Sequence, residues 1–118
     1  MTRSPTNVAV LGSTGSIGRS ALEVIGASEG RLRAVALTAH TSTRQLAEQA
    51  RSARPRWVVV TDAKAAASGY GWSMPPGVEV LAGPESVARV VGDPEVDVVL
   101  SAVVGRAGLE GTWAALEA

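Results

Sequence analysis

The sequence has no cysteine, no phenylalanine and a single histidine, His40. Without cysteine the chain cannot form a disulfide, a thiolate metal site or a cysteine nucleophile, and one histidine cannot build a multi-histidine metal site. Aromatic residues make up only 3% of the 118 positions, so the core must be aliphatic. Thiol chemistry and histidine-rich metal chemistry are therefore excluded.

The sequence also lacks an excess of charge of either sign and any long apolar run. Eleven basic and eleven acidic residues give a formal net charge of zero, which argues against a nucleic acid or an anionic membrane as partner. No apolar run approaches the roughly 20 residues of a membrane span, and residues 1–7 are polar, with no signal-peptide core. We expect a soluble, cytoplasmic protein.

The chain is rich in valine and alanine, which dominate a hydrophobic content of 46%. That composition is typical of a buried parallel sheet flanked by small-residue helices. Helical patterns separate the apolar runs, so we expect one α/β domain with a doubly wound, Rossmann-like parallel sheet and right-handed crossovers. The apolar runs predict five strands, at Val8–Leu11, Ala34–Leu37, Trp57–Val60, Val78–Leu81 and Asp97–Leu100.

Local signals predict the helices. Ser42 and Gln45 have the form of a capping box that opens a helix closed by Pro55. A short alanine-rich helix is expected at Asp62–Ser68, and Pro84 can occupy the first position of another. Apolar spacing predicts one face of the first helix, formed by Ile17, Ala21, Val24 and Ile25, and one face of the last, formed by Leu109, Trp113 and Leu116.

The most informative stretch is LGSTGSIG, Leu11–Gly18, in which three glycines stand three residues apart. It follows the first predicted strand and opens the first predicted helix, within a βαβ unit of about thirty residues. The first turn of a helix has unpaired backbone N–H groups and a partial positive charge, so it can hold a pyrophosphate that comes close enough. Glycine permits that approach because it has no Cβ.

Each glycine of this stretch has a predicted task. Gly12 makes the tight turn, Gly15 admits the pyrophosphate and Gly18 lets the helix pack against the first strand. The spacing is G-x-x-G-x-x-G rather than G-x-G-x-x-G, so the turn is one residue longer. The alternative is a tight strand–helix turn that binds nothing. Hydroxyl donors around the same anion would come from Ser13, Thr14 and Ser16.

The segment about 20 residues beyond the glycines distinguishes NAD from NADP. A chain that binds NAD usually carries Asp or Glu there, but residues 37–44 contain no carboxylate. Hydroxyls, a helix N-terminus and Arg44 would hold a 2′-phosphate, so we favour NADP. His40 could contact the adenine or the 2′-phosphate, or it could be an exposed loop residue. Arg44 could equally be an ordinary exposed helix residue.

The end of the last strand is a second candidate region, because open α/β sheets bind ligands at the carboxyl ends of their strands. Ala102, Val103 and Gly105 would present small surfaces to a cofactor there, and tight packing of a strand–helix corner is the alternative.

Two other sets of residues are interpreted as structural. The tryptophans are core or loop anchors (Trp57, Trp72 and Trp113), and the closely spaced carboxylates form a solvated turn rather than a metal site (Asp93, Glu95 and Asp97).

Several of these stretches together resemble the 1-deoxy-D-xylulose 5-phosphate reductoisomerase family. That family opens with the same LGSTGSIG, and the resemblance extends to Val35–Ala39, Arg54–Arg56 and Ser101–Leu109. It covers nearly the whole chain. Many family members carry Gly-Lys-Asn where this chain has His40, Thr41 and Ser42.

The resemblance implies an enzyme that uses NADPH and a divalent metal (Mg or Mn). It implies conversion of a phosphorylated sugar, 1-deoxy-D-xylulose 5-phosphate, to 2-C-methyl-D-erythritol 4-phosphate, on the non-mevalonate route to isoprenoids. It further implies a homodimer when the enzyme is complete. The predicted cofactor-binding residues are Gly12, Ser13, Thr14, Gly15, Ser16, Ile17, Gly18, Ala39, His40, Thr41, Ser42, Arg44, Ala102, Val103 and Gly105.

Members of that family run to several hundred residues, and their metal carboxylates and substrate-binding residues come after position 118. We therefore expect residues 1–118 to be an incomplete dinucleotide-binding domain, with no catalytic or metal-binding residue and no activity alone. Two alternatives remain. One is a stand-alone module that binds or senses NADP(H), and the other is the cofactor domain of a different Rossmann dehydrogenase, such as a semialdehyde dehydrogenase or dihydrodipicolinate reductase.

Overall fold

A five-stranded parallel sheet forms the centre of the structure, a computed structural model that describes residues 5–67 and 75–101. The strands lie in the order β4-β3-β2-β1-β5, and every neighbouring pair is parallel. Each agrees with a predicted strand to within two residues at either end. The strands are β1 (Thr6–Leu11), β2 (Leu32–Ala39), β3 (Trp57–Val60), β4 (Glu79–Ala82) and β5 (Val98–Ser101).

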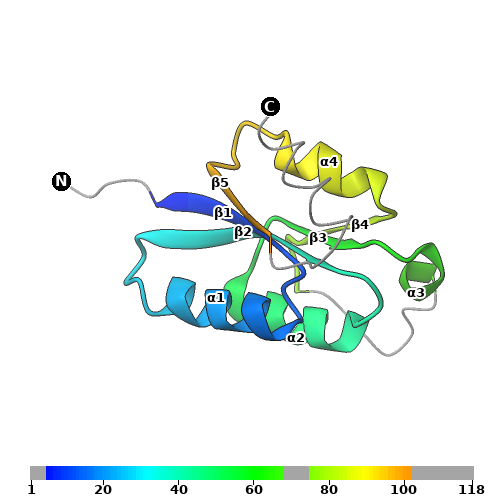
Figure 1. The fold of residues 1–118 in the computed structure, drawn as a ribbon, viewed down its shortest axis with the longest axis horizontal. Coiled ribbons are helices and arrows are strands. Elements are labelled where there is room, and N and C mark those ends of the chain that lie inside the picture. The colour runs from blue at the N-terminus through cyan, green and yellow to red at the C-terminus, as the bar shows by residue number, and fades with distance from the viewer. Residues whose placement is uncertain (1–4, 68–74, 102–118) are drawn as a thin grey trace.

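Helices lie on both faces of this sheet (Figure 1). α1 (Ser16–Gly26) and α2 (Thr43–Ala53) lie on one face and α4 (Glu85–Val91) lies on the other, while the short α3 (Ala63–Ala67) follows β3. The chain passes from β4 at one edge of the sheet to β5 at the other. Because such crossovers are right-handed, this reversal of direction carries α4 to the second face. The predicted doubly wound α/β fold is confirmed.

The side chains of β1 alternate between two aliphatic cores. Val8 and Val10 pack with Leu46 of α2 on one face, whereas Ala9 packs with Val90 of α4 on the other. β3 is buried throughout, and β2 is buried over most of its length, as apolar runs without alternation predict. Trp57 is 6% exposed and belongs to the second core, which confirms it as a core anchor.

The face of α1 that meets the sheet differs from the predicted one. Ala21 and Ile25 pack against the core as expected, but Ile17 and Val24 are 57% and 63% exposed. Gly18 is the buried residue of the helix. Its close approach to the end of β1 sets the rotation of the helix about its axis, so the inward positions are counted from Gly18 rather than from Ile17.

α2 begins at Thr43 and ends before Pro55, as predicted, but the capping box does not form. Ser42 occupies the N-cap position with φ −80° and ψ 63°, not the extended backbone that a capping side chain needs, and it makes no side-chain cap hydrogen bond. The Thr43 N–H instead donates to the Thr41 carbonyl at 2.8 Å. Gln45 is exposed.

β1 is the point at which the winding of the sheet changes direction. The chain reaches β2 on one side of β1 through α1, and it reaches β5 on the other side through α4. Ligands of open α/β sheets bind at the carboxyl ends of the strands beside such a switch point. The glycine-rich stretch follows β1 directly, so the fold puts it there. Trp72 and the helix predicted beyond Ser101 lie outside the described residues.

Candidate functional site

The glycine-rich stretch forms a closed turn that leads from β1 into α1. Gly12 has φ +76°, a left-handed conformation that favours glycine, and the Gly15 N–H donates to the Gly12 carbonyl at 3.2 Å. The first backbone bond of the helix then runs from the Arg19 N–H to the Gly15 carbonyl at 2.9 Å. The predicted task of Gly12 in the tight turn is confirmed.

The start of α1 has N–H donors that no described residue satisfies. The N–H groups of Ser16, Ile17 and Gly18 precede the first helical bond, so they have no carbonyl partner within the helix. No side chain caps the helix at Gly15, and its first turn has no acidic residue. Unpaired N–H groups and the positive end of the helix dipole together attract an anion.

Gly18 is glycine because the helix lies directly against the turn. A Cβ built there would lie 2.3 Å from the Gly12 carbonyl oxygen and 2.6 Å from the Ser13 Cα. Both neighbours are backbone atoms, so neither can move aside as a side-chain end would. This contact gives Gly18 the packing task predicted for it.

Gly15 has no comparable internal reason to be glycine. Its φ of −75° and ψ of 172° are open to any residue, and an added Cβ would lie 3.6 Å from the Gly12 oxygen, an ordinary contact distance. The residue is exposed. Among the described residues nothing requires the absence of a side chain at this position.

Ser13 faces the interior rather than the anion. It is completely buried, its N–H donates to the Thr38 carbonyl at 2.9 Å, and its hydroxyl donates to the Gln49 side-chain oxygen at 2.7 Å. Both of its donors are therefore engaged inside the fold, and the prediction of a hydroxyl donor to phosphate does not fit this position. Thr14 is partly buried and Ser16 is exposed, so both remain accessible.

The second predicted segment, between β2 and α2, lies at the same edge of the sheet. β2 and β1 are paired and parallel, so the residues that follow them are neighbours. His40, Thr41 and Arg44 are exposed, and the His40 Nδ1 lies 2.9 Å from the Thr61 hydroxyl. Ala39 is buried in the core and its carbonyl accepts the Thr61 N–H at 2.9 Å, so this residue lies behind the exposed edge.

Sequence reasoning missed two residues that hold the turn, Thr38 and Gln49. The Thr38 hydroxyl accepts the Gly12 N–H at 2.9 Å, and Gln49 donates to the Ser13 carbonyl at 2.7 Å. Thr38 could have been noticed as a polar residue within a buried strand. Gln49 stands beside Leu46 and Ala50 on the inner side of α2, but nothing in its spacing names a partner 36 residues away.

The remaining candidates add no described residue to this edge. Ala102, Val103 and Gly105 lie outside the described residues. Over residues 5–67 and 75–101 there is no group of three or more His, Asp or Glu side chains that could hold a metal ion. Glu95 pairs with Arg56, and Asp97 accepts the Asn7 N–H, in agreement with the turn predicted for these carboxylates. No helix in the described part of the chain is long and apolar enough to cross a membrane.

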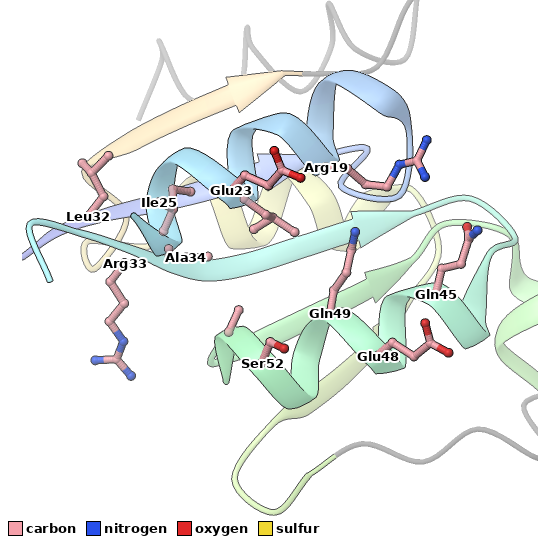
Figure 2. Close-up of a pocket in the computed structure, with 13 residues that line it drawn as sticks. Arg19, Glu23, Ile25, Leu32, Arg33, Ala34, Gln45, Glu48, Gln49 and Ser52 are labelled. Atoms are coloured by element: carbon pink, nitrogen blue, oxygen red, sulfur yellow. The ribbon is translucent and has the colours of Figure 1, made fainter. Parts of the chain in front are cut away.

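A groove of about 650 Å³ lies between α1 and α2 (Figure 2). Its floor is aliphatic, and it includes Leu22 and Ile25 of α1 and Ala34 of β2. None of the residues from Gly12 to Gly18 lines it, so the hollow is separate from the candidate anion site. Gln49 belongs to the groove wall and also reaches the turn, which makes it the link between the two.

Comparison with known proteins gives a consistent result. A family model described as 1-deoxy-D-xylulose 5-phosphate reductoisomerase matches residues 8–118. The reductoisomerase of Methylococcus capsulatus is 45% identical over an alignment of 119 positions, gaps included, which covers 94% of this chain and 29% of the relative. That of Rhodococcus jostii is 46% identical over 114 residues, which cover 96% of this chain and 27% of the relative.

Solved structures agree with the sequence relatives. The reductoisomerase from Zymomonas mobilis in complex with NADPH superposes with a TM-score of 0.79 at 32% identity, over 95% of this chain and 29% of that one. A reductoisomerase in complex with magnesium gives the same TM-score and identity. The chain thus spans less than a third of the length of the relatives it matches.

Proposed function

The chain belongs to the 1-deoxy-D-xylulose 5-phosphate reductoisomerase family, and from that premise we propose that it is the NADPH-binding part of such an enzyme. The whole enzyme would convert 1-deoxy-D-xylulose 5-phosphate to 2-C-methyl-D-erythritol 4-phosphate. This chain would fix the cofactor in reacting geometry against a substrate held elsewhere, and such positioning supplies much of the rate of an enzyme.

The observation that carries this proposal is the contrast at Gly15. A glycine with an ordinary backbone conformation and room for a Cβ is unexplained by the fold, but it is explained by a ligand that lies against the backbone. The next two residues, Ser16 and Ile17, are exposed, and their N–H groups have no partner within the helix. A pyrophosphate would accept those bonds, with Thr14 and the Ser16 hydroxyl beside it.

The 2′-phosphate of NADPH would lie at the start of α2. The first turn of α2 has no acidic residue, Arg44 provides an exposed cation there, and the Ser42 hydroxyl does not cap the helix. His40 and Thr41 stand exposed on the same connection. These groups favour a phosphate over a bare ribose hydroxyl, because an NAD site would be expected to carry a carboxylate.

The other parts of the proposed enzyme rest on the relatives. One solved relative holds NADPH, fosmidomycin and magnesium together. When bound, NADPH supplies the hydride for the reduction, and Ala102, Val103 and Gly105 would present small surfaces to it. A divalent metal and the phosphorylated sugar would be held by residues outside those described. We further propose a homodimeric, cytoplasmic enzyme.

Titration of the complete polypeptide that carries this sequence with NADPH and with NADH, followed by fluorescence, tests the proposal. We expect NADPH to bind at least tenfold more tightly than NADH, a difference of about 1.4 kcal/mol. Arg44→Ala should reduce that preference and leave NADH binding unchanged, with the exposed Arg51 of the same helix, replaced by Ala, as control. A polypeptide that binds neither NADPH nor NADH would refute the proposal. Equal binding would refute the assignment of NADPH alone.

A further inference from the structure

The backbone of Gly12 and Ser13 is held from three directions. Gly18 of α1 lies against it so closely that even a methyl group would collide. Thr38 of β2 accepts the N–H groups of both residues, through its hydroxyl and its carbonyl. Gln49 of α2 provides the third contact, with two hydrogen bonds to Ser13.

The two bonds of Gln49 define how its amide is turned. The Ser13 carbonyl can only accept, so the Gln49 nitrogen must face it, and it donates there at 2.7 Å. The Gln49 oxygen then faces the Ser13 hydroxyl, which donates to it at 2.7 Å. A carboxylate at position 49 would set an anionic oxygen against the carbonyl. Asparagine is one methylene shorter, so it could not make both bonds from the same backbone position.

We propose that Gln49 is a positioning residue that keeps the glycine turn in its anion-binding shape, an inference that rests on the proposed function. Gln49 fixes the Ser13 peptide, and the open N–H groups at Ser16 and Ile17 begin three residues further on. If the peptide could rotate, the binding-competent turn would be only one of several conformations. The apparent affinity for the cofactor would fall in proportion to its population.

The fold does not depend on Gln49 in the way that the turn does. α2 packs on the sheet through Leu46, Ala47 and Ala50, which are fully buried, whereas Gln49 is only partly buried and borders the groove between the helices. Figure 2 shows its side chain extending from α2 into the space between α2 and α1. Loss of the amide should therefore leave α2 packed on the sheet, so that cofactor binding can still be measured.

The first test compares Gln49→Ala with Gln45→Ala in the complete polypeptide that carries this sequence. Gln45 is the same residue type one turn earlier on the same helix and lines the same groove, but it is exposed and has no bond to the turn. We expect Gln49→Ala to weaken NADPH binding about tenfold and to lower Tm, because the buried Ser13 carbonyl loses its partner, and Gln45→Ala to change neither. Amide hydrogen exchange should also speed up at residues 12–17 in Gln49→Ala, without cofactor, and not in α2.

A second variant, Gln49→Glu, separates positioning from general damage. A protonated carboxyl has the same pattern as the amide, since its hydroxyl can donate to the Ser13 carbonyl and its other oxygen can accept from the Ser13 hydroxyl. Repulsion between the carboxylate and the Ser13 carbonyl oxygen should raise the pKa of this carboxyl above the ordinary glutamate value of about 4.3. NADPH affinity relative to the wild type at the same pH should then be low at pH 8, about tenfold down, and should recover toward pH 5. Glu48→Gln serves as the control for neighbouring charge, since the charged groups around the same groove are Arg19, Glu23, Arg33 and Glu48.

The outcomes distinguish this inference from the proposed function. Wild-type protein that binds no NADPH would overturn both. Wild-type protein that binds NADPH, together with Gln49→Ala that binds it equally well, would overturn only the positioning role. So would a Gln49→Glu variant whose relative affinity does not change with pH, even if Gln49→Ala proved too unstable to measure.

Discussion

The end of the sheet at which the strands begin, here called the amino edge, differs from the end at which they finish, the carboxyl edge, in how its polar groups are satisfied. At the amino edge, the Asn7 N–H donates to the Asp97 carboxylate at 2.8 Å and the Asp97 N–H donates back to the Asn7 carbonyl at 2.9 Å. Glu95 pairs with Arg56, whose guanidinium also lies over the Trp57 ring, 4.8 Å from its centroid. At the carboxyl edge, the first turn of α1 has three N–H groups with no helical partner and no capping side chain.

This contrast indicates which part of the molecule is available to a ligand. At the amino edge most donors and acceptors bind one another, although the buried Asn7 Oδ1 has no partner among the described residues, so a ligand there would have to compete with the chain itself. At the carboxyl edge, the unpaired N–H groups of α1 raise the free energy of the folded chain, and a bound anion that accepts their hydrogen bonds removes that cost. Variants at the amino edge should therefore alter stability without altering NADPH binding. Variants at the outer surface of the carboxyl edge should do the reverse.

The largest effect is expected for Gly18→Ala, which should reduce both stability and NADPH binding. Its methyl group would collide with the Gly12 and Ser13 backbone, so the helix must shift away from the turn. We expect a loss of roughly 3 kcal/mol in the free energy of unfolding, together with loss of NADPH binding. Urea denaturation measures the first and titration the second. A variant as stable as the wild type would show that α1 does not lie as close to the turn as described.

Gly15→Ser is the sharpest probe of the open edge. Serine is a preferred N-cap residue and the backbone at position 15 suits it, so the free energy of unfolding should change by about 0.5 kcal/mol or less. The added side chain would occupy the space proposed for the pyrophosphate, so NADPH binding should weaken at least about tenfold. Thermal unfolding and fluorescence titration on the same sample give both values. Undiminished binding would remove the main support for the site.

Asp97→Ala tests the amino edge of the sheet. It leaves the Asn7 N–H without its carboxylate partner, so we expect the free energy of unfolding to fall by about 1 kcal/mol. Asp97→Asn keeps an oxygen that can accept the same bond and should lose less. NADPH affinity should stay the same in both variants. A change in affinity comparable to Gly15→Ser would contradict the division between the two edges.

The smallest effect is expected for Glu95→Gln. The Arg56 and Glu95 side chains are 52% and 47% exposed, so solvent screens their attraction and the pair contributes about 0.5 kcal/mol or less. The difference between variant and wild type in chemical denaturation should shrink further as salt is added. A difference that persists in high salt would mean that the pair is better shielded from solvent than its exposure indicates.

The fold was predictable because its signals are local. Runs of valine and alanine marked all five strands, and the glycine spacing marked the turn and the tasks of Gly12 and Gly18. The inward face of α1 was not predictable, because periodicity defines faces but not which one meets the sheet. That choice follows from one backbone contact at Gly18, which exposes Ile17 and Val24.

The inner support of the site was hidden for a different reason. Ser13 looked like a donor to the anion because it stands among the glycines, yet its hydroxyl bonds to Gln49, 36 residues away. Partners so distant along the chain leave no spacing that can be read from the sequence. The outer part of the site, which consists of backbone N–H groups and glycines, needs no distant partner and was therefore the part that sequence reasoning reached.

The position of β1 in the middle of the sheet has a consequence for the order in which the protein is made. β1 can pair with β2 as soon as β2 has emerged from the ribosome, but its other side has no partner strand until β5 follows, about ninety residues after β1. During that interval a nascent chain presents an unpaired strand to its surroundings. The glycine turn between β1 and α1 would thus begin to form early in synthesis, whereas β1 itself gains its second neighbouring strand late.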